Sequence, residues 1–314
     1  MSGVFPRICW CARRDIGFSA APPTDQLVES YRDVRDPSYL DLKTWRSRNF
    51  DRVLALVERW QRLGDLFEVG CAYGLFLKVA SARGWTACGV EPSRWAVKSG
   101  RELYRVNLEV GTLEGSEPPL NASDCVAMFD VLEHLAPSLA ALRRCSRWLR
   151  LSGILVLTLP NAASWLARLM GNRWLGHVTA HLTCFTQRSV KSALVSGDFE
   201  LISFGPQPKQ LPLGYVAGHL GTGSPLSRVV AGIAKLPWLE RMAVPLSTMD
   251  SLIVIAKPPN SDKSARAADA WRASGQARLT STMWTPQVGR RSPTMRAVPS
   301  TSRGSGVAAW QAQT

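Results

Sequence analysis

Residues 66–76, with the sequence Leu-Phe-Glu-Val-Gly-Cys-Ala-Tyr-Gly-Leu-Phe, constrain the fold of this chain more than any other stretch. The apolar residues up to Val69 predict a short buried strand, Gly70 and Gly74 predict a tight loop, and a helix is expected from Leu75 onward. A strand–glycine loop–helix unit lets backbone approach a ligand closely, and it directs the N–H groups of a helix start toward that ligand. The stretch therefore predicts an α/β fold with a ligand site beside the loop.

A second signal lies 21 residues after Gly70, where the apolar run 85–91 ends at Glu91. An acid at the tip of the second strand is placed to accept hydrogen bonds from both hydroxyls of a ribose. A dinucleotide fingerprint would need Gly-x-Gly-x-x-Gly to hold a pyrophosphate, whereas this loop reads Gly70-x-x-x-Gly74 with Ala72 between the glycines. The loop lacks this pyrophosphate cradle, so the spacing argues against a dehydrogenase.

Downstream of Glu91, apolar strands continue to alternate with helical segments, which predicts a mostly parallel sheet covered on both faces. Ser93 and Thr186 are expected to cap two of the helices. The further strands are expected at 108–110, 125–129, 153–159, 197–204 and 249–256, and the helices at 37–61, 94–104, 139–149 and 186–195. Ligands of such sheets bind outside the carboxyl ends of the strands, so the residues at those ends should converge on one crevice. They are Gly70, Glu91, Thr112, Asp130 and Asn161.

Composition divides the 314 residues into a large domain and two flanking segments. Residues 1–30 show little periodicity and are expected to be irregular, and one α/β domain is expected at 31–258. Residues 259–314 are rich in Ser, Thr, Ala, Arg, Gly and Pro, so they are expected to form a disordered basic tail.

The formal net charge of +14 invites a nucleic-acid partner, but its distribution argues against one. The segment 259–314 holds eight Lys or Arg and two Asp, and the other basic residues are scattered without a block. No apolar run is long enough to span a membrane, and the first residues lack the apolar stretch of a secretory signal. The seven cysteines are odd in number and mostly scattered, which is typical of reduced thiols, so a cytoplasmic location is expected. The pair Cys9 and Cys11 lacks the spacing and partners of a zinc site.

The spacing Glu68-x-Gly70-x-x-x-Gly74 resembles motif I of the class I S-adenosylmethionine (SAM)-dependent methyltransferases. The resemblance covers roughly residues 27–258 and extends to the type 11/12/23 group, which includes relatives of the ubiquinone-biosynthesis O-methyltransferases. The further segments that carry it are 89–93, 129–135, 149–161, 181–186 and 197–200. It implies a Rossmann-like, seven-stranded, mostly parallel sheet with the last strand antiparallel and helices on both faces. The methyltransferase domain would then be 31–258, with acceptor-side insertions at 162–186 and 207–248.

The resemblance also implies the cofactor and the residues around it. SAM is the expected cofactor, with its methionine part against the glycine loop, its ribose on Glu91 and its adenine near Thr112 and Leu113. The residues expected to contact the cofactor are Glu68, Gly70, Cys71, Ala72, Gly74, Glu91, Pro92, Thr112, Leu113, Asp130 and Val131. The expected activity is methyl transfer to a small-molecule acceptor, most simply to a hydroxyl oxygen. Two alternatives stay open: a non-catalytic SAM-binding partner subunit, and a nucleic-acid methyltransferase.

The nucleic-acid alternative is disfavoured because amino methylases of this fold carry an Asn/Asp-Pro-Pro-aromatic motif after the fourth strand. Here that place reads Asp130-Val131-Leu132-Glu133. The acceptor itself and the oligomeric state are not predicted by any motif.

Transfer to a hydroxyl needs a general base, and the candidates are His134, His177 and His181, with His181 preferred by resemblance. If residues 130–134 form a helical turn, Asp130, Glu133 and His134 share one face, and with His181 they would supply the ligands of a divalent cation such as Mg²⁺. Related methyltransferases of ubiquinone biosynthesis and of small-RNA 3′ ends bind metal through a similar motif. We favour the simpler interpretation, in which Glu133 and His134 brace the loop and no metal is expected.

Overall fold

A computed structural model of the chain describes residues 8–19, 29, 31–32, 34–116, 118, 121–171, 174, 176, 180–212, 243–245 and 250–259. The chain divides into two units, 1–258 with 310–314 and 259–309. Apart from Pro259, every described residue belongs to the first unit. Residues 260–314 of the expected tail and most of the expected insertion at 207–248 lie outside the described residues.

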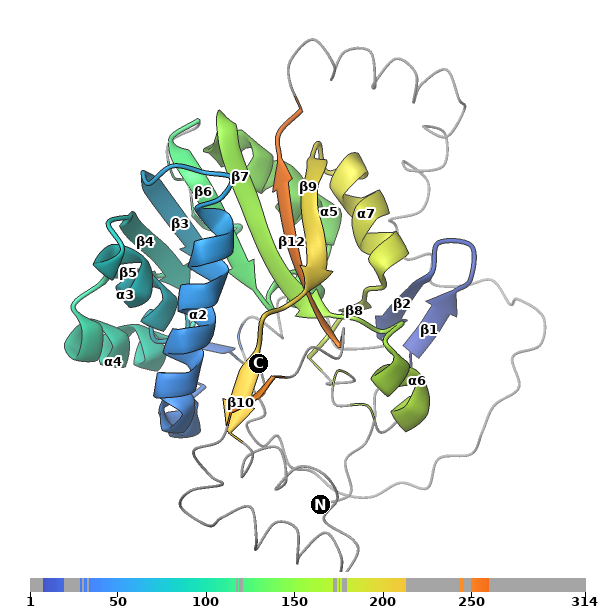
Figure 1. Cartoon of the computed structure of the whole chain (residues 1–314), viewed down its shortest axis with the longest axis horizontal. Coiled ribbons are helices and arrows are strands. Elements are labelled where there is room, and N and C mark those ends of the chain that lie inside the picture. The colour runs from blue at the N-terminus through green and yellow to red at the C-terminus, as the bar shows by residue number, and fades with distance from the viewer. Residues whose placement is uncertain are drawn as a thin grey trace, which may run out of the picture. The chain divides into compact units, whose positions relative to one another are not determined.

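The centre of the first unit is a seven-stranded sheet with the order β5-β4-β3-β6-β7-β12-β9 (Figure 1). The neighbours from β5 to β7 pair in parallel, and β12 pairs antiparallel with both β7 and β9. The strand bounds are β3 Asp65–Val69, β4 Thr86–Glu91, β5 Asn107–Val110, β6 Ser123–Phe129, β7 Leu149–Pro160, β9 Glu200–Pro206 and β12 Ser251–Lys257. The predicted fold class, including the antiparallel last strand, is confirmed.

Helices cover both faces of the sheet, because successive residues of the buried strands point to opposite sides. In β6, Cys125 and Ala127 pack with α2, α3 and α4, whereas Val126 and Met128 pack with α5 and α7. Figure 1 shows α2 crossing in front of the sheet and α5 behind it. The helix bounds are α2 Lys43–Val57, α3 Leu75–Ala82, α4 Arg94–Tyr104, α5 Ser138–Trp148 and α7 Gln187–Ser196. Two apolar layers therefore sandwich the sheet, as continuous apolar strands require.

The predicted caps are confirmed. The Ser93 hydroxyl accepts a hydrogen bond from the Ala96 N–H at the start of α4. Thr186 and Ser189 form a reciprocal capping box at the start of α7. Shorter helical pieces are the 3₁₀ turns η1 Pro37–Leu42 and η2 Leu132–His134, and α6 Trp165–Met170. The helix expected at 37–61 thus begins as a 3₁₀ turn and ends at Val57.

The N-terminal segment departs from expectation, because residues 8–19 form a β-hairpin and not an irregular stretch. Strands β1 Ile8–Cys11 and β2 Ile16–Ser19 pair with each other, and β2 pairs with β8 Thr183–Cys184. The Thr186 hydroxyl also donates to the backbone oxygen of Asp15 at 2.8 Å. A strand of four residues is too short for its hydrophobic alternation to be recognised in the sequence. The third strand of this small sheet, β8, lies far from the hairpin along the chain.

The carboxyl ends of β3, β4, β6, β7 and β9 share one edge of the sheet, since β9 is antiparallel to β12 and therefore parallel to β7. At this edge the Asn161 N–H donates to the Asp250 oxygen at 2.8 Å, which joins the end of β7 to the start of β12. Two further short strands, β10 Gln210–Pro212 and β11 Ala243–Pro245, pair with each other. None of the described helices has both the length and the apolar character needed to cross a bilayer.

Candidate functional site

The glycine loop after β3 is shaped by three residues in the left-handed region, where side chains are disfavoured. Gly70 has φ of 74°, Ala72 has 47° and Gly74 has 73°. Close contacts add a second reason for the glycines. A Cβ on Gly70 would lie 2.5 Å from Val131 Cγ2, and a Cβ on Gly74 would lie 2.8 Å from Val106 Cγ2. Both glycines are therefore required by the loop itself.

Ala72 takes the same left-handed conformation with a methyl group attached. The position costs a non-glycine residue about 1–2 kcal/mol. Glycine would fit here without that strain, so the alanine between the two glycines carries a local cost in stability.

The loop's N–H groups are largely used inside the protein. Gly70 and Cys71 donate to the Val90 oxygen at 2.8 and 3.2 Å, and Gly74 donates to the Cys71 oxygen at 2.7 Å. The Ala72 N–H donates to Glu91 Oε2 at 2.9 Å. A loop that cradles a phosphate must present such groups to the ligand, so this loop is unsuited to a pyrophosphate.

Glu91 ends β4 and ties two segments together. Its Oε2 accepts from Ala72 of the loop, and its Oε1 accepts from the Ser93 N–H at 3.0 Å, at the start of α4. Burial raises the pKa of Glu91, although these two hydrogen bonds favour the charged form. Each carboxylate oxygen has two lone pairs, and each accepts one backbone N–H here. Each oxygen can therefore accept one further hydrogen bond, which is enough for two hydroxyl groups.

Glu68 lies inside the sheet beneath the loop, only 2% exposed. Its Oε2 has no hydrogen-bond partner among the described residues. Burial, and after it the charge of Glu91, raises the pKa of Glu68 well above its usual value. The carboxyl of Glu68 therefore stays protonated to a higher pH than the carboxyl of an exposed glutamate.

The side chain of Cys71, a loop residue that is expected at the cofactor, is buried. Its thiol is 3% exposed and donates to the backbone oxygens of Glu68 and Val90, both at 3.1 Å. Gly89 makes room for this sulfur, because a Cβ there would lie 2.3 Å from Cys71 Sγ. Sequence reasoning did not predict that Gly89 of β4 makes room for this thiol; the available signal was a glycine inside a strand, which often marks close approach.

An aromatic group covers the loop from the side of η1 and α4. The rings of Tyr39 and Tyr73 stack with centroids 5.2 Å apart, and Tyr73 packs edge-on against Trp95 at 5.4 Å. The Tyr73 hydroxyl donates to the Asp36 oxygen at 2.6 Å. The Arg46 guanidinium lies 4.1 Å from the centre of the Tyr39 ring, and burial raises the pKa of Tyr39 to about 12. The sequence predicted a helix at 37–61, but it did not single out Tyr39 and Arg46.

At the end of β6, Asp130 also has a positive φ of 54° and its N–H donates to the Thr158 oxygen at 3.0 Å. The next residue, Val131, places its side chain against Gly70. Leu113, expected to bound the adenine, is 4% exposed and belongs to the apolar layer beneath the sheet edge. Thr112 and Pro92 lie at the same edge, after β5 and β4, and are partly buried.

The predicted histidines His134 and His181 come together, with ring centroids 4.6 Å apart. His134 Nδ1 lies 2.9 Å from the Ala180 oxygen and 3.0 Å from the Tyr31 hydroxyl, and His181 Nδ1 lies 2.8 Å from the Gly176 oxygen. Carbonyl acceptors at both Nδ1 atoms favour the tautomer with the proton on Nδ1. Burial lowers the pKa of His134 to about 4, so this ring is neutral near pH 7. His177 lies outside the described residues.

The side chain of Glu133 lies close to those of His134 and His181. It is 1% exposed, neither of its carboxylate oxygens has a hydrogen-bond partner among the described residues, and its Oε1 lies 4.0 Å from His181 Nε2. One ligand atom from each of the three residues lies within 4.8 Å of the others. Two imidazoles and a carboxylate are a donor set that fits a divalent cation.

Asp130 does not belong to that group. Its left-handed backbone precedes the 3₁₀ turn η2, so the helical face expected for residues 130, 133 and 134 does not form. Burial raises the pKa of Glu133, and the charge of Asp130 raises it further.

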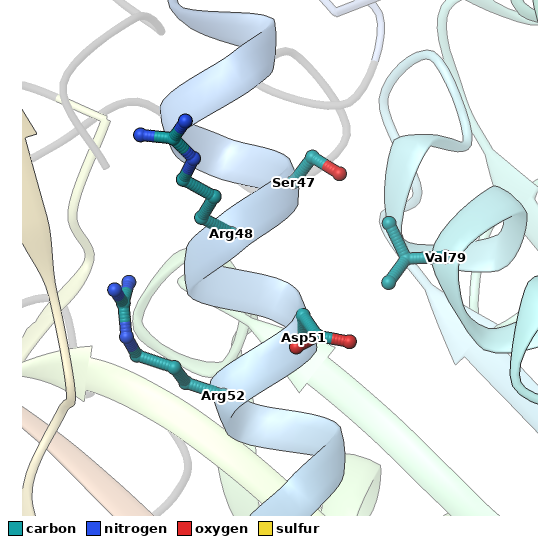
Figure 2. A pocket seen from close by; sticks show the side chains of 5 residues that line it. All are labelled: Ser47, Arg48, Asp51, Arg52 and Val79. Carbon is teal, nitrogen blue, oxygen red and sulfur yellow. The ribbon is translucent and has the colours of Figure 1, made fainter.

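A pocket of about 310 Å³ is lined by residues of α2 and by Val79 of α3. Figure 2 shows Ser47 and Asp51 on the side of α2 that faces Val79, with Arg48 and Arg52 pointing to the other side. Arg83 binds Asp51 at 2.7 Å, and Arg52 binds Gln210 Oε1 at 2.6 Å, so part of the lining is already paired. None of the residues expected at the cofactor lines this pocket.

Comparison with known proteins agrees with the fold. Residues 42–203 match the family described as Methyltransferase domain. Two proteins from strains of Mycobacterium tuberculosis, each named "Probable S-adenosylmethionine-dependent methyltransferase", are 28% identical over 144 residues, which is 46% of this chain and 52% of theirs. The chain thus spans about half the length of these curated relatives.

Among solved structures, a SAM-dependent methyltransferase of Leishmania major aligns with a TM-score of 0.50 at 10% identity, covering 74% of this chain and 82% of that one. The geranyl diphosphate C-methyltransferase of Streptomyces coelicolor aligns with a TM-score of 0.52 at 11% identity, covering 76% and 99%. At such identities the likeness concerns the fold alone.

The family match covers half of the chain, and it agrees with the strand order and with the loop after β3. The chain belongs to the methyltransferase domain family of class I SAM-dependent proteins. At the level of the family, SAM is thereby confirmed as the cofactor.

Proposed function

We propose that this protein is a SAM-dependent methyltransferase that acts on a small-molecule acceptor, with a hydroxyl oxygen as the methylated atom. The observation that carries the proposal is the geometry of Glu91. Its two oxygens each accept one backbone N–H, from Ala72 and Ser93, and each keeps a lone pair that a ribose hydroxyl can use. Most N–H groups of the adjacent loop donate to oxygens of the protein itself, and this arrangement suits a cofactor without phosphates.

In this proposal the methionine part of SAM lies along Gly70–Gly74, above Glu68, and the adenine lies beyond Glu91 near Thr112 and Leu113. The aromatic group of Tyr39 and Tyr73 covers the loop from the other side. The contribution of these residues is to hold donor and acceptor in line, and good alignment can be worth about 7–11 kcal/mol in such reactions. The transferred methyl passes from the positively charged sulfur to the acceptor oxygen, whose proton must leave.

His181 is the proposed general base for that proton. With its Nδ1–H donated to the Gly176 oxygen, the neutral ring carries its lone pair on Nε2. His134 is the weaker candidate, because a group with a pKa of about 4 has little affinity for a proton near pH 7. Its contacts with Ala180 and Tyr31 suit a role in positioning the loop that carries His181.

A divalent cation could be held by Glu133, His134 and His181, and it would there polarise an acceptor oxygen. We retain the simpler proposal, in which the cluster braces the end of β6 against the loop that holds His181. That bracing includes the hydrogen bond from the Leu182 N–H to the Glu133 oxygen at 2.8 Å.

The test is a transfer assay with SAM carrying a labelled methyl group and a panel of phenols, alcohols, amines and thiols, read as S-adenosylhomocysteine (SAH) formed and label in the product. Labelling of a hydroxyl compound by the wild type, lost in Glu91→Ala, supports the proposal. Selective labelling of nitrogen or sulfur compounds would reject the oxygen acceptor. SAH binding without any transfer across the panel would favour the non-catalytic partner subunit.

A further inference from the structure

A segment before η1, which we call the strap, comprises the described residues 31–32 and 34–36. One end of the strap is attached to the turn that follows β6. The Tyr31 hydroxyl lies 3.0 Å from His134 Nδ1, and the two rings meet edge-on with centroids 5.9 Å apart. His134 belongs to η2, the 3₁₀ turn just after β6. A polar contact and a ring contact therefore hold this end of the strap.

The other end of the strap is attached to the glycine loop and to the start of α4. The Tyr73 hydroxyl of the loop donates to the Asp36 oxygen at 2.6 Å. The Ser93 hydroxyl, two residues after the end of β4, donates to the Val34 oxygen at 2.9 Å. Both acceptors are backbone oxygens, so these two hydrogen bonds fix the course of the main chain of the strap.

The attachments place the strap across the edge of the sheet at which the candidate site lies. The strands β4, β3 and β6 are consecutive in the sheet and parallel, so their carboxyl ends share this edge. Adjacent strands are about 4.8 Å apart, which makes β4 and β6 about 10 Å apart. The strap is attached after β6 at one end and after β3 and β4 at the other. It therefore crosses the strand ends beside the glycine loop.

The residues that hold the strap also contact the residues proposed to bind SAM. Ser93 donates through its hydroxyl to the strap and through its N–H to Glu91 Oε1 at 3.0 Å. Tyr73 follows Ala72, whose N–H donates to Glu91 Oε2. Tyr73 is 2% exposed and Ser93 is 4% exposed. The surroundings of Glu91 are thus covered where the strap is attached.

The strap is attached by contacts that can open locally. None of its described side chains is fully buried, and none belongs to either apolar layer of the sheet. Segments with few buried apolar contacts open at low free energy, far below that of global unfolding. The three hydrogen bonds join groups of the protein to each other, so their formation does not require a cofactor.

We propose that the strap is a gate over the cofactor site, which detaches from His134, Ser93 and Tyr73 to let SAM enter and SAH leave. Covering segments of this kind commonly control ligand entry and product release. This inference rests on the proposed function, because the site beneath the strap is defined by where SAM lies.

A gate has a kinetic signature that a ligand contact lacks. A hydroxyl that fastens the strap to the protein stabilises the closed form equally with and without ligand. Its removal should therefore raise the association rate and the dissociation rate of SAH by the same factor and leave Kd unchanged. Removal of a hydroxyl that contacts SAH would instead raise the dissociation rate and weaken the affinity.

The experiment measures both SAH rate constants by surface plasmon resonance on the immobilised full chain, and Kd independently by calorimetry. The variants are Tyr31→Phe and Tyr73→Phe, which each remove one hydroxyl and keep the ring, and the double variant. Tyr104→Phe is the matched control, because the hydroxyl of this α4 residue forms no hydrogen bond with the described residues. Thermal unfolding confirms that every variant is folded at the temperature of the assay.

The inference predicts that both rate constants rise about threefold to tenfold in Tyr31→Phe and in Tyr73→Phe, and further in the double variant, with Kd within about twofold. Tyr104→Phe should keep the wild-type rates. Rates within about twofold of the wild type in both single variants would overturn the inference. Faster dissociation with an unchanged association rate would also overturn it, since the hydroxyls would then be ligand contacts. Absence of SAH binding by the wild type would refute the proposed function and, with it, the inference.

Discussion

The Ala72 N–H donates to Glu91 Oε2 at 2.9 Å, so the glycine loop after β3 is fastened directly to the acid at the end of β4. The two residues are 19 positions apart, and the parallel pairing of β3 with β4 brings them to the same edge. The acid that is proposed to bind the ribose is therefore also the residue that sets the position of the loop. A change at either one should alter both ligand affinity and local stability.

Glu91→Ala should lower SAH affinity about 100-fold, because two hydrogen bonds to a charged group at roughly 1.5 kcal/mol each are lost. Calorimetric titration measures this. Glu109→Gln, at an exposed glutamate of the next strand, is the control and should leave the affinity unchanged. An affinity of Glu91→Ala within about threefold of wild type would refute the ribose assignment.

Ala72→Gly should stabilise the protein by about 0.5–1 kcal/mol. The change relieves a left-handed alanine that costs about 1–2 kcal/mol, and part of that gain is offset by the greater freedom of glycine in the unfolded chain. Gly74→Ala is the opposite change and should destabilise by about 1–2 kcal/mol or more, since a Cβ there would lie 2.8 Å from Val106 Cγ2. The measurement is the free energy of unfolding in urea for the wild type, Ala72→Gly and Gly74→Ala. An Ala72→Gly variant that is less stable than the wild type would contradict the strain argument.

Glu68→Gln should stabilise the protein at pH 8 and have less effect at pH 5. Burial and the charge of Glu91 raise the pKa of Glu68 in the folded state, and Cys71, Tyr39 and Cys125 are further titratable groups near it. A carboxyl with a raised folded pKa stabilises the fold below its unfolded pKa, and that stability is lost as the pH rises through the folded value. At pH 8 the gain should exceed the roughly 0.5 kcal/mol typical of an exposed substitution.

The measurement for Glu68→Gln is the free energy of unfolding at the two pH values, with Glu109→Gln as the exposed control. A wild type that is more stable than Glu68→Gln at pH 8 would show that the buried carboxylate has a charged partner in the folded protein.

His181→Ala should lower kcat by about 10²–10⁴-fold, the usual contribution of a general base, and leave SAH affinity within about threefold. His134→Gln should have a smaller effect on kcat, because a ring with a pKa of about 4 is a poor proton acceptor near pH 7. Steady-state kinetics with an acceptor found in the panel, beside SAH titrations, separates the two roles. The base would have to be reassigned if His134→Gln proved as damaging as His181→Ala while both bound SAH normally.

Much of the fold could be predicted from the sequence because its signals are local. Continuous apolar runs such as 125–129 mark buried parallel strands, and Ser93 and Thr186 stand at the helix starts that they cap. The loop residues Gly70 and Gly74 were predictable for the same reason, since their left-handed backbone leaves few other choices.

The remaining features depend on contacts between distant parts of the chain. The hairpin at 8–19 needs β8 as its partner, and the hydrogen bonds between Asn49 and Gln210 join residues 161 positions apart. Asp130 was expected on a helical turn with Glu133, but its left-handed backbone is set by the end of β6 and is not visible in its own sequence. Inward rotation of Cys71 likewise requires the space that Gly89 leaves on the next strand.

The most direct test of the account is a calorimetric titration of the full chain with SAM, run beside titrations with SAH and NAD and repeated with a metal chelator. The account predicts saturable one-to-one binding of SAM and SAH in the micromolar range, no binding of NAD, and no change on chelation. Binding of NAD in preference to SAM, or no binding of SAM at all, would contradict the assignment of Glu91 and the glycine loop as a SAM site.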